Sequence, residues 1–99
     1  MYETGRAWPH RVVVLRTRPN DLAVTRFGFA IGKRLGGAVV RNSIRRRIRE
    51  VLRRLDVVPG YDVVVIGRQP ILEASYGDLQ AGLTQALHRA RLLAAPSAG

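Results

Sequence analysis

The apolar positions of residues 38–55 recur at the spacing of one face of an α-helix. They fall at i, i+4, i+7, i+8 and i+11, at Ile44, Ile48, Val51, Leu52 and Leu55. Such a stripe is typical of a helix that packs on a hydrophobic core. The helix is expected to begin between Ala38 and Ser43, after Gly36-Gly37, and to end near Leu55.

Three other segments have the pattern of β-strands, at residues 11–16, 24–32 and 61–67. The second alternates: Phe27, Phe29 and Ile31 share one face, whereas Arg26, Gly28, Ala30 and Gly32 share the other. Because the second face is small, a packed helix or the backbone of a ligand could approach it closely. The third segment is a continuous apolar run, which predicts an interior strand.

A second helix is predicted after Ser75-Tyr76-Gly77-Asp78, a plausible capping box, with an apolar stripe at Leu79, Leu83, Ala86, Leu87 and Ala90. The order β-β-α-β-α predicts an α+β fold, a mixed β-sheet packed with two helices. Ninety-nine residues suffice for a single small domain, residues 1–93, with a frayed tail at 94–99. The general rule for a β-α-β crossover predicts a right-handed connection.

The charge of the chain indicates its partners rather than its fold. The formal net charge is +10, and residues 4–49 hold twelve basic side chains against one acid, Asp21. So large an excess favours a phosphate-rich polymer as the partner. Cysteine is absent, and no apolar run approaches the roughly 18 residues of a membrane span. We therefore expect a cytoplasmic protein with no membrane association.

The arginines of the first predicted helix gather on one face. Measured from Ile44, an arc from about 100° to 200° holds Asn42, Arg45, Arg46, Arg49 and Arg53. Arg47 and Arg54 lie on the opposite flank. Like charges at i, i+4 repel, and phosphates would relieve that repulsion. Lys33 and Arg34 extend the same site, and the alternative is a basic face that is merely solvated.

No constellation of catalytic or metal-binding residues is visible. His10 and His88 lack metal-ligand spacing, and the seven acids form no obvious acid–base pair. We therefore predict neither a catalytic side chain nor a protein metal site.

Residues 27–50 closely resemble the signature of the bacterial ribonuclease P protein component. That signature has Gly-Phe followed by a pair of cationic residues, a glycine turn, Ala-Val-x-Arg-Asn-Arg and a basic helix. Residues 61–68 with Pro70, and residues 75–87, resemble the family's later strand and last helix. The resemblance implies a ribosomal-protein-like fold with a left-handed β-α-β crossover, against the general rule.

The same resemblance implies a function. The protein would be a subunit of an endoribonuclease, a hydrolase active in tRNA processing, that removes the 5′ leader of precursor tRNA. The chemistry would belong to the catalytic ribonuclease P RNA, which uses Mg²⁺. The expected partners are this RNA and precursor tRNA, with the protein monomeric within the ribonucleoprotein.

The resemblance also assigns residues. Contacts with the catalytic RNA carry over to Arg41, Asn42, Arg45, Arg46 and Arg49, with Lys33 and Arg34 as neighbours, and the helical projection adds Arg53. A leader-binding cleft is predicted to include Tyr2, Trp8, His10, Arg11 and Val13. Trp8 could stack on a base there or serve in packing.

Two departures from the family pattern stand out. Ser43 replaces the last arginine of Arg-Asn-Arg, which removes one cationic contact. Residues 2–5 match only the end of the family's first helix, so we hypothesise an N-terminally shortened version of the family. The family's leader cleft lies between that helix and the adjoining sheet.

Two further functions use the same basic surface. One is that of a ribosome-associated or other structural RNA-binding protein. The other is a double-stranded DNA binder with the arginine helix in the major groove. In that second case only Asn42 is suited to reading adenine.

Overall fold

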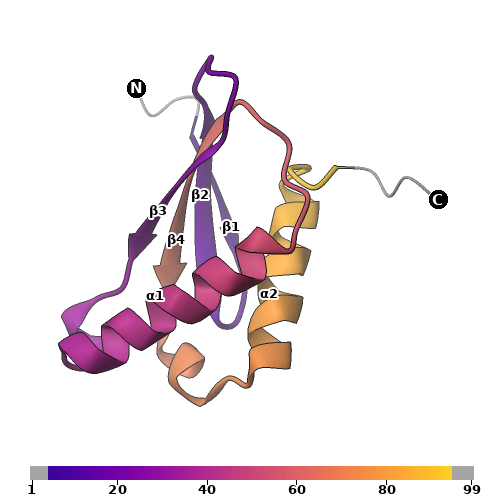
Figure 1. Ribbon diagram of the computed structural model, residues 1–99. Coiled ribbons are helices and arrows are strands. Elements are labelled where there is room, and N and C mark those ends of the chain that lie inside the picture. The colour runs from indigo at the N-terminus through magenta and orange to yellow at the C-terminus, as the bar shows by residue number, and fades with distance from the viewer. Residues whose placement is uncertain (1–4, 95–99) are drawn as a thin grey trace.

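Four strands and two helices make up the computed structural model, which describes residues 5–94 (Figure 1). The strands are β1 (Arg6–Pro9), β2 (Val13–Pro19), β3 (Arg26–Ala30) and β4 (Tyr61–Gly67). The helices are α1 (Ala38–Arg53) and α2 (Tyr76–Arg89), and two short 3-10 helices are η2 (Lys33–Leu35) and η3 (Gln69–Glu73). The sheet order is β1-β2-β4-β3, antiparallel except for the parallel pair β3 and β4.

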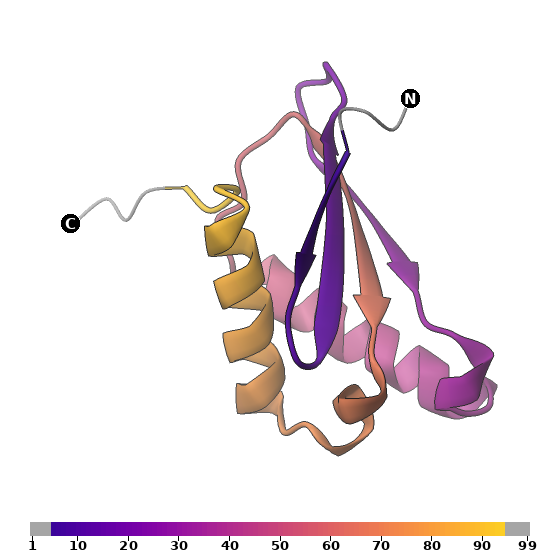
Figure 2. The same cartoon turned by 180° about the vertical axis from the view of Figure 1, so that it is seen from behind.

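The hydrophobic core lies between the helices and one face of this sheet. Leu15 of β2 and Phe29 of β3 both pair with Val65 of β4, so their side chains share a face. Leu15 and Val65 are completely buried there, together with Ile48 of α1 and Leu83 of α2. Figures 1 and 2 show α1 running across this face and α2 standing beside β1 and β2.

The connection from β3 through α1 to β4 is left-handed. In Figure 1 the strands β3 and β4 both point downward, α1 passes in front of the sheet, and β4 lies to the right of β3. Figure 2 shows the same elements from behind, with α1 on the far side of the sheet. The expectation from the family resemblance is thus confirmed, and the right-handed default is wrong for this chain.

Most predicted elements are present, with shifted ends. β4 spans the predicted residues and is interior, and α1 begins at the early end of its predicted range. The capping box of α2 is formed: the Asp78 amide donates to Ser75 Oγ at 3.0 Å, and the Ser75 amide donates to Asp78 Oδ2 at 3.2 Å. The strand predicted at 11–16 instead begins at Val13 and runs to Pro19. Pro19 has no backbone N–H to donate, and it is tolerated here because the pairing of β2 with β1 ends at Thr17.

The small face of β3 is open, contrary to the expectation of a packed helix. Phe27 and Phe29 pack against the core, so the helices cover the aromatic face instead. A Cβ added at Gly28 would meet only the Val64 side chain, at 3.9 Å, and Val64 itself is 37% exposed. Burial of the two large aromatic rings outweighs the close approach that glycine would permit.

The end of the described chain is held in place. The Ala94 amide donates to the Asp56 carbonyl at 2.7 Å, and Leu93 forms a β-bridge with Val57. Ala94 therefore does not belong to a frayed tail; the other residues predicted for that tail, 95–99, lie outside the described residues.

Candidate nucleic-acid interface

The start of α1 is fixed by a glycine turn. Buried Leu35 anchors η2 on the core. Gly36 then adopts φ 141°, a backbone conformation that residues other than glycine rarely adopt. A Cβ at Gly36 would also lie 2.9 Å from Val40 Cβ. Gly37 caps the helix without a side-chain hydrogen bond. The first amides of α1 are therefore free of a side-chain cap, and Lys33 and Arg34 lie exposed just before them.

Two side chains of the Arg-Asn motif are held by local hydrogen bonds. Arg41 Nε donates to the Gly36 carbonyl at 3.1 Å, which folds this side chain back over the glycine turn. Asn42 Oδ1 accepts from Arg45 Nη1 at 2.8 Å. Each bond occupies one of five guanidinium N–H groups, so both arginines keep donors for a phosphate.

Arg45, Arg49 and Arg53 form a row along the side of α1 next to β3. The Arg49 guanidinium carbon lies 5.5 Å from the centre of the Phe29 ring, within the range of a cation–π contact. A shallow groove of about 370 Å³ lies here, and it is lined by Phe27, Phe29, Leu52, Arg49 and Arg53. The cationic row thus borders an aromatic floor.

The aromatic floor of this groove, formed by Phe27 and Phe29, was not predicted from the sequence. Its signal was the Phe-x-Phe alternation of residues 27–29, which showed that the two rings share a face. What was lacking was the placement of α1 over that face.

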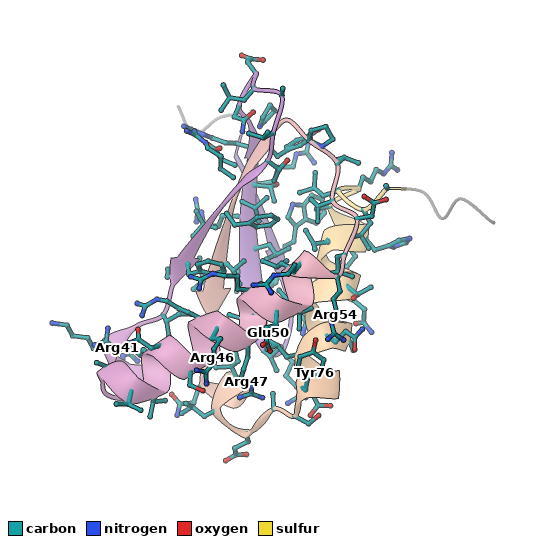
Figure 3. All side chains as sticks on the ribbon, viewed as in Figure 1. Arg41, Arg46, Arg47, Glu50, Arg54 and Tyr76 are labelled. Carbon is teal, nitrogen blue, oxygen red and sulfur yellow. The ribbon has the colours of Figure 1, made fainter. Side chains whose placement is uncertain are left out.

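The other flank of α1 serves the fold. Arg47 Nη2 donates to the Ala74 carbonyl at 2.8 Å and so ties α1 to the segment before α2. Figure 3 shows Arg47, Glu50 and Arg54 on the side of α1 toward Tyr76 at the start of α2, and Arg41 near the helix start. The helical projection placed Arg47 and Arg54 on this flank, and they do lie apart from the row beside β3.

No arginine of α1 forms an ion pair within residues 5–94. The ion pairs there join Asp62 to Arg26 at 2.8 Å and to Arg18 at 3.9 Å, all outside α1. Arg46 and Arg53 are exposed and form no side-chain hydrogen bond within the same range. The face therefore has donors and charge available for an anionic partner.

The Asp62 carboxylate of β4 accepts hydrogen bonds from Arg26 and Asn20. Its hydrogen bonds from Arg26, first, and from Asn20 lower its pKa from 3.8 to about 2, with the charges of Arg26 and Arg18 acting in the same direction. The same pairing raises the pKa of Arg26. This cluster binds the β2–β3 segment to β4, and its role is structural.

Residues 5–94 contain no group of three His, Asp or Glu side chains that could hold a metal ion. None of the helices in that range is long and apolar enough to span a membrane.

Comparison with known proteins decides the family. The model of the family Ribonuclease P matches residues 1–91. The ribonuclease P protein component of Roseiflexus sp. is 48% identical over 98 residues, which cover 96% of this chain and 80% of that protein. The chain belongs to the ribonuclease P protein family. The predicted role, as an RNA-binding protein component of the endoribonuclease ribonuclease P in tRNA processing, is confirmed over the other two.

Solved ribonuclease P proteins share the fold. That of Staphylococcus aureus superposes with a TM-score of 0.82 at 31% identity, covering 94% of this chain and 87% of that one. That of Thermotoga maritima gives a TM-score of 0.81 at 26% identity, covering 89% and 86%. The ribonuclease P protein fold, with its mixed four-stranded sheet and two helices, is therefore confirmed for residues 5–94.

Within residues 5–94, the residues predicted for the ribonuclease P leader cleft do not lie on one surface. Val13 is completely buried beneath the helices, so its assignment to the cleft is wrong. His10 closes the β1–β2 turn: its amide donates to the Val13 carbonyl, and its Nδ1 accepts from the Val12 amide at 3.3 Å. Arg11 is exposed in the same turn. Tyr2 lies outside the described residues.

Trp8 lies on the helix side of the sheet. It pairs with buried Leu15 across β1 and β2, and its Nε1 donates to Thr17 Oγ1 at 3.1 Å. It therefore faces away from the open face that carries Gly28 and Val64.

Proposed function

We propose that α1 and the turn before it bind the catalytic RNA of ribonuclease P. The contact set is Lys33, Arg34, Arg41, Asn42, Arg45, Arg46, Arg49 and Arg53. The observation that carries the proposal is the row of Arg45, Arg49 and Arg53, which has no acidic partner within residues 5–94. Arg49 and Arg53 line one groove with Phe27 and Phe29. Phosphates would neutralise this row, and release of their counterions would drive binding.

The 5′ leader of precursor tRNA would lie across the open face of the sheet. Both described helices occupy the other face, so this is the sheet surface left for a cleft. Gly28 and Ala30 have small side chains that leave this surface flat, and exposed Arg16 contributes charge. A single copy of the chain would act in the cytoplasm as part of the ribonucleoprotein.

Bond cleavage would belong to the RNA subunit. Mg²⁺ bound by that RNA would supply the activated water and stabilise the leaving oxygen. The residues of this chain bind and orient RNA; they neither hold the metal nor move a proton in the reaction.

Reconstitution tests this function. The chain is mixed with ribonuclease P RNA and precursor tRNA at low Mg²⁺, and leader removal is measured. The protein should stimulate cleavage, and Arg45→Ala with Arg49→Ala should reduce the stimulation about tenfold or more, since each charged hydrogen bond contributes roughly 1.5 kcal/mol.

The matched control is Arg47→Ala with Arg54→Ala, which removes the same charge from the opposite flank of α1. It should keep most of the stimulation if circular dichroism shows it folded. A chain that binds the RNA and never stimulates cleavage would contradict the function.

A further inference from the structure

A basic pocket, distinct from the groove beside α1, lies at the far end of the molecule from the start of α1. It encloses about 520 Å³ between β1, β2, the start of β4 and the C-terminal end of α2, and no residue of α1 lines it. Two aromatic and four cationic side chains surround it: Trp8, Tyr61, Arg6, Arg18, Arg89 and Arg91. No acid is among its lining residues.

The tryptophan ring in this pocket is fixed before any ligand arrives. Thr17, which is 8% exposed, accepts the indole N–H, and the ring packs on the core at its other side. Tyr61 also packs on the core and completes the aromatic lining. A fixed aromatic ring beside open space is a stacking platform that any nucleobase can use.

Arg89 is fixed as well. Its Nη1 donates to the Pro9 carbonyl at 2.7 Å, a bond that joins the end of α2 to the end of β1. The rest of its guanidinium forms no hydrogen bond with residues 5–94. Its remaining N–H groups are thus available at a set position for a phosphate.

Arg91 stands where helices usually place glycine. The Leu92 amide donates to the Leu87 carbonyl at 2.9 Å and the Arg91 amide to the His88 carbonyl at 3.0 Å, which is the Schellman pattern that ends α2. Arg91 occupies its left-handed position with φ 62°. An arginine is unfavourable in this conformation, so its presence here, as a lining residue of the pocket, is a sign of function.

We propose that this pocket binds one unpaired nucleotide of RNA. The base stacks against Trp8 and Tyr61, and the phosphate contacts Arg89 and Arg91. Within residues 5–94 neither of these arginines has a carboxylate partner, whereas Arg18 reaches Asp62 at 3.9 Å. The combination of aromatic rings with fixed guanidinium groups fits a nucleotide better than a bare phosphate. The inference rests on the proposed function and extends it to a third RNA contact.

The single tryptophan of the chain gives a direct readout. Trp8 fluorescence is titrated with the unstructured oligonucleotide U5, in a background carrying Arg45→Ala and Arg49→Ala so that the face of α1 is weakened. Saturable quenching is expected. Arg89→Gln with Arg91→Gly should raise the Kd about fivefold or more, whereas Arg47→Gln with Arg54→Gln, which removes equal charge elsewhere, should change it less than twofold.

The single variant Arg91→Gly separates an effect on binding from an effect on folding. Because glycine adopts a left-handed conformation without strain, Arg91→Gly alone should leave the melting temperature unchanged or raise it while it weakens U5 binding. Absence of quenching by U5, or an unchanged Kd in the Arg89→Gln, Arg91→Gly variant, would overturn the proposal.

Two more titrations identify the source of the nucleotide. Trp8 quenching by ribonuclease P RNA alone that weakens in the pocket variant assigns it to the catalytic RNA, and the same result with precursor tRNA alone assigns it to the substrate. If neither RNA quenches, the proposal fails. Since leader cleavage is not the readout, such a failure leaves the proposed function, tested by reconstitution, intact.

Discussion

Gly36 sets the position from which the arginines of α1 project. Its φ of 141° turns the chain from η2 into the helix, and its carbonyl accepts the Arg41 guanidinium. Gly37, its neighbour, has φ −75°, and a Cβ there would meet nothing within 4 Å. Two adjacent glycines thus differ in what they require, although the sequence presents them as equals.

Replacement of these glycines should separate the two. Gly36→Ala should lower the free energy of unfolding by about 1–3 kcal/mol, because alanine is strained at that φ and its Cβ would contact Val40. Gly37→Ala should lower it by less than about 1 kcal/mol, because alanine is a poorer N-cap residue than glycine but also restricts the unfolded chain. Urea denaturation measures both, and equal effects at the two positions would contradict the geometry.

The arginines of α1 also differ one by one. Arg47 is bonded to the Ala74 carbonyl, Arg49 lies over Phe29, and Arg45 is steered by Asn42. Composition gives all of them the same charge. Their division into structural residues and proposed RNA contacts depends on which side of α1 meets β3 and which meets α2.

At the scale of elements, Asp62 joins three strands. It pairs with Arg26 of β3, lies 3.9 Å from Arg18 of β2, and accepts from Asn20 in the segment that connects them. It is therefore a clamp on the open side of the sheet, next to the surface proposed for the leader.

This clamp predicts a pH dependence. The pKa of Asp62 is lowered in the folded protein to about 2 from 3.8, so its stabilising effect is present above about pH 4 and is lost as the pH falls toward 2. The melting temperature of Asp62→Asn should therefore fall less steeply than that of the wild type over this range. Asp21→Asn is the control and should follow the wild-type profile; identical profiles for all three proteins would refute the clamp.

Elements with strong local signals could be predicted from the sequence. β4 has a continuous apolar run, and α2 has both a capping box and an apolar stripe. β1 was missed because its four residues include Pro9 and show no alternation; it is a strand through its pairing with β2. The direction of the crossover was available from the family resemblance, since general packing rules give the opposite hand.

The candidate sites also divide into one that local sequence signals predict and one that they do not. The cationic face of α1 could be read from helical periodicity, because all its residues belong to one helix. The pocket around Trp8 could not, because Trp8, Tyr61 and Arg91 come from three distant segments that only the folded chain brings together. Val13 was misassigned because alternation in β2 does not say which face the helices cover.

At the scale of the molecule, basic residues gather in three regions. They are the face of α1 beside β3, the open face of the sheet, and the pocket at the end of α2. An RNA-binding subunit so arranged can contact a catalytic RNA and a substrate strand at once. The net charge of +10 is therefore divided among these regions, the last two of which adjoin at Arg6 and Arg18.

The salt dependence of RNA binding tests the central claim, that the face of α1 beside β3 holds the catalytic RNA. The affinity for ribonuclease P RNA is measured from low to high KCl, and the logarithm of the binding constant is plotted against that of the salt concentration. Arg45→Ala with Arg49→Ala should make the slope shallower by about two, one for each lost phosphate contact. Arg47→Ala with Arg54→Ala should change it by less than about one. A slope unchanged by the first pair would remove this face from the interface.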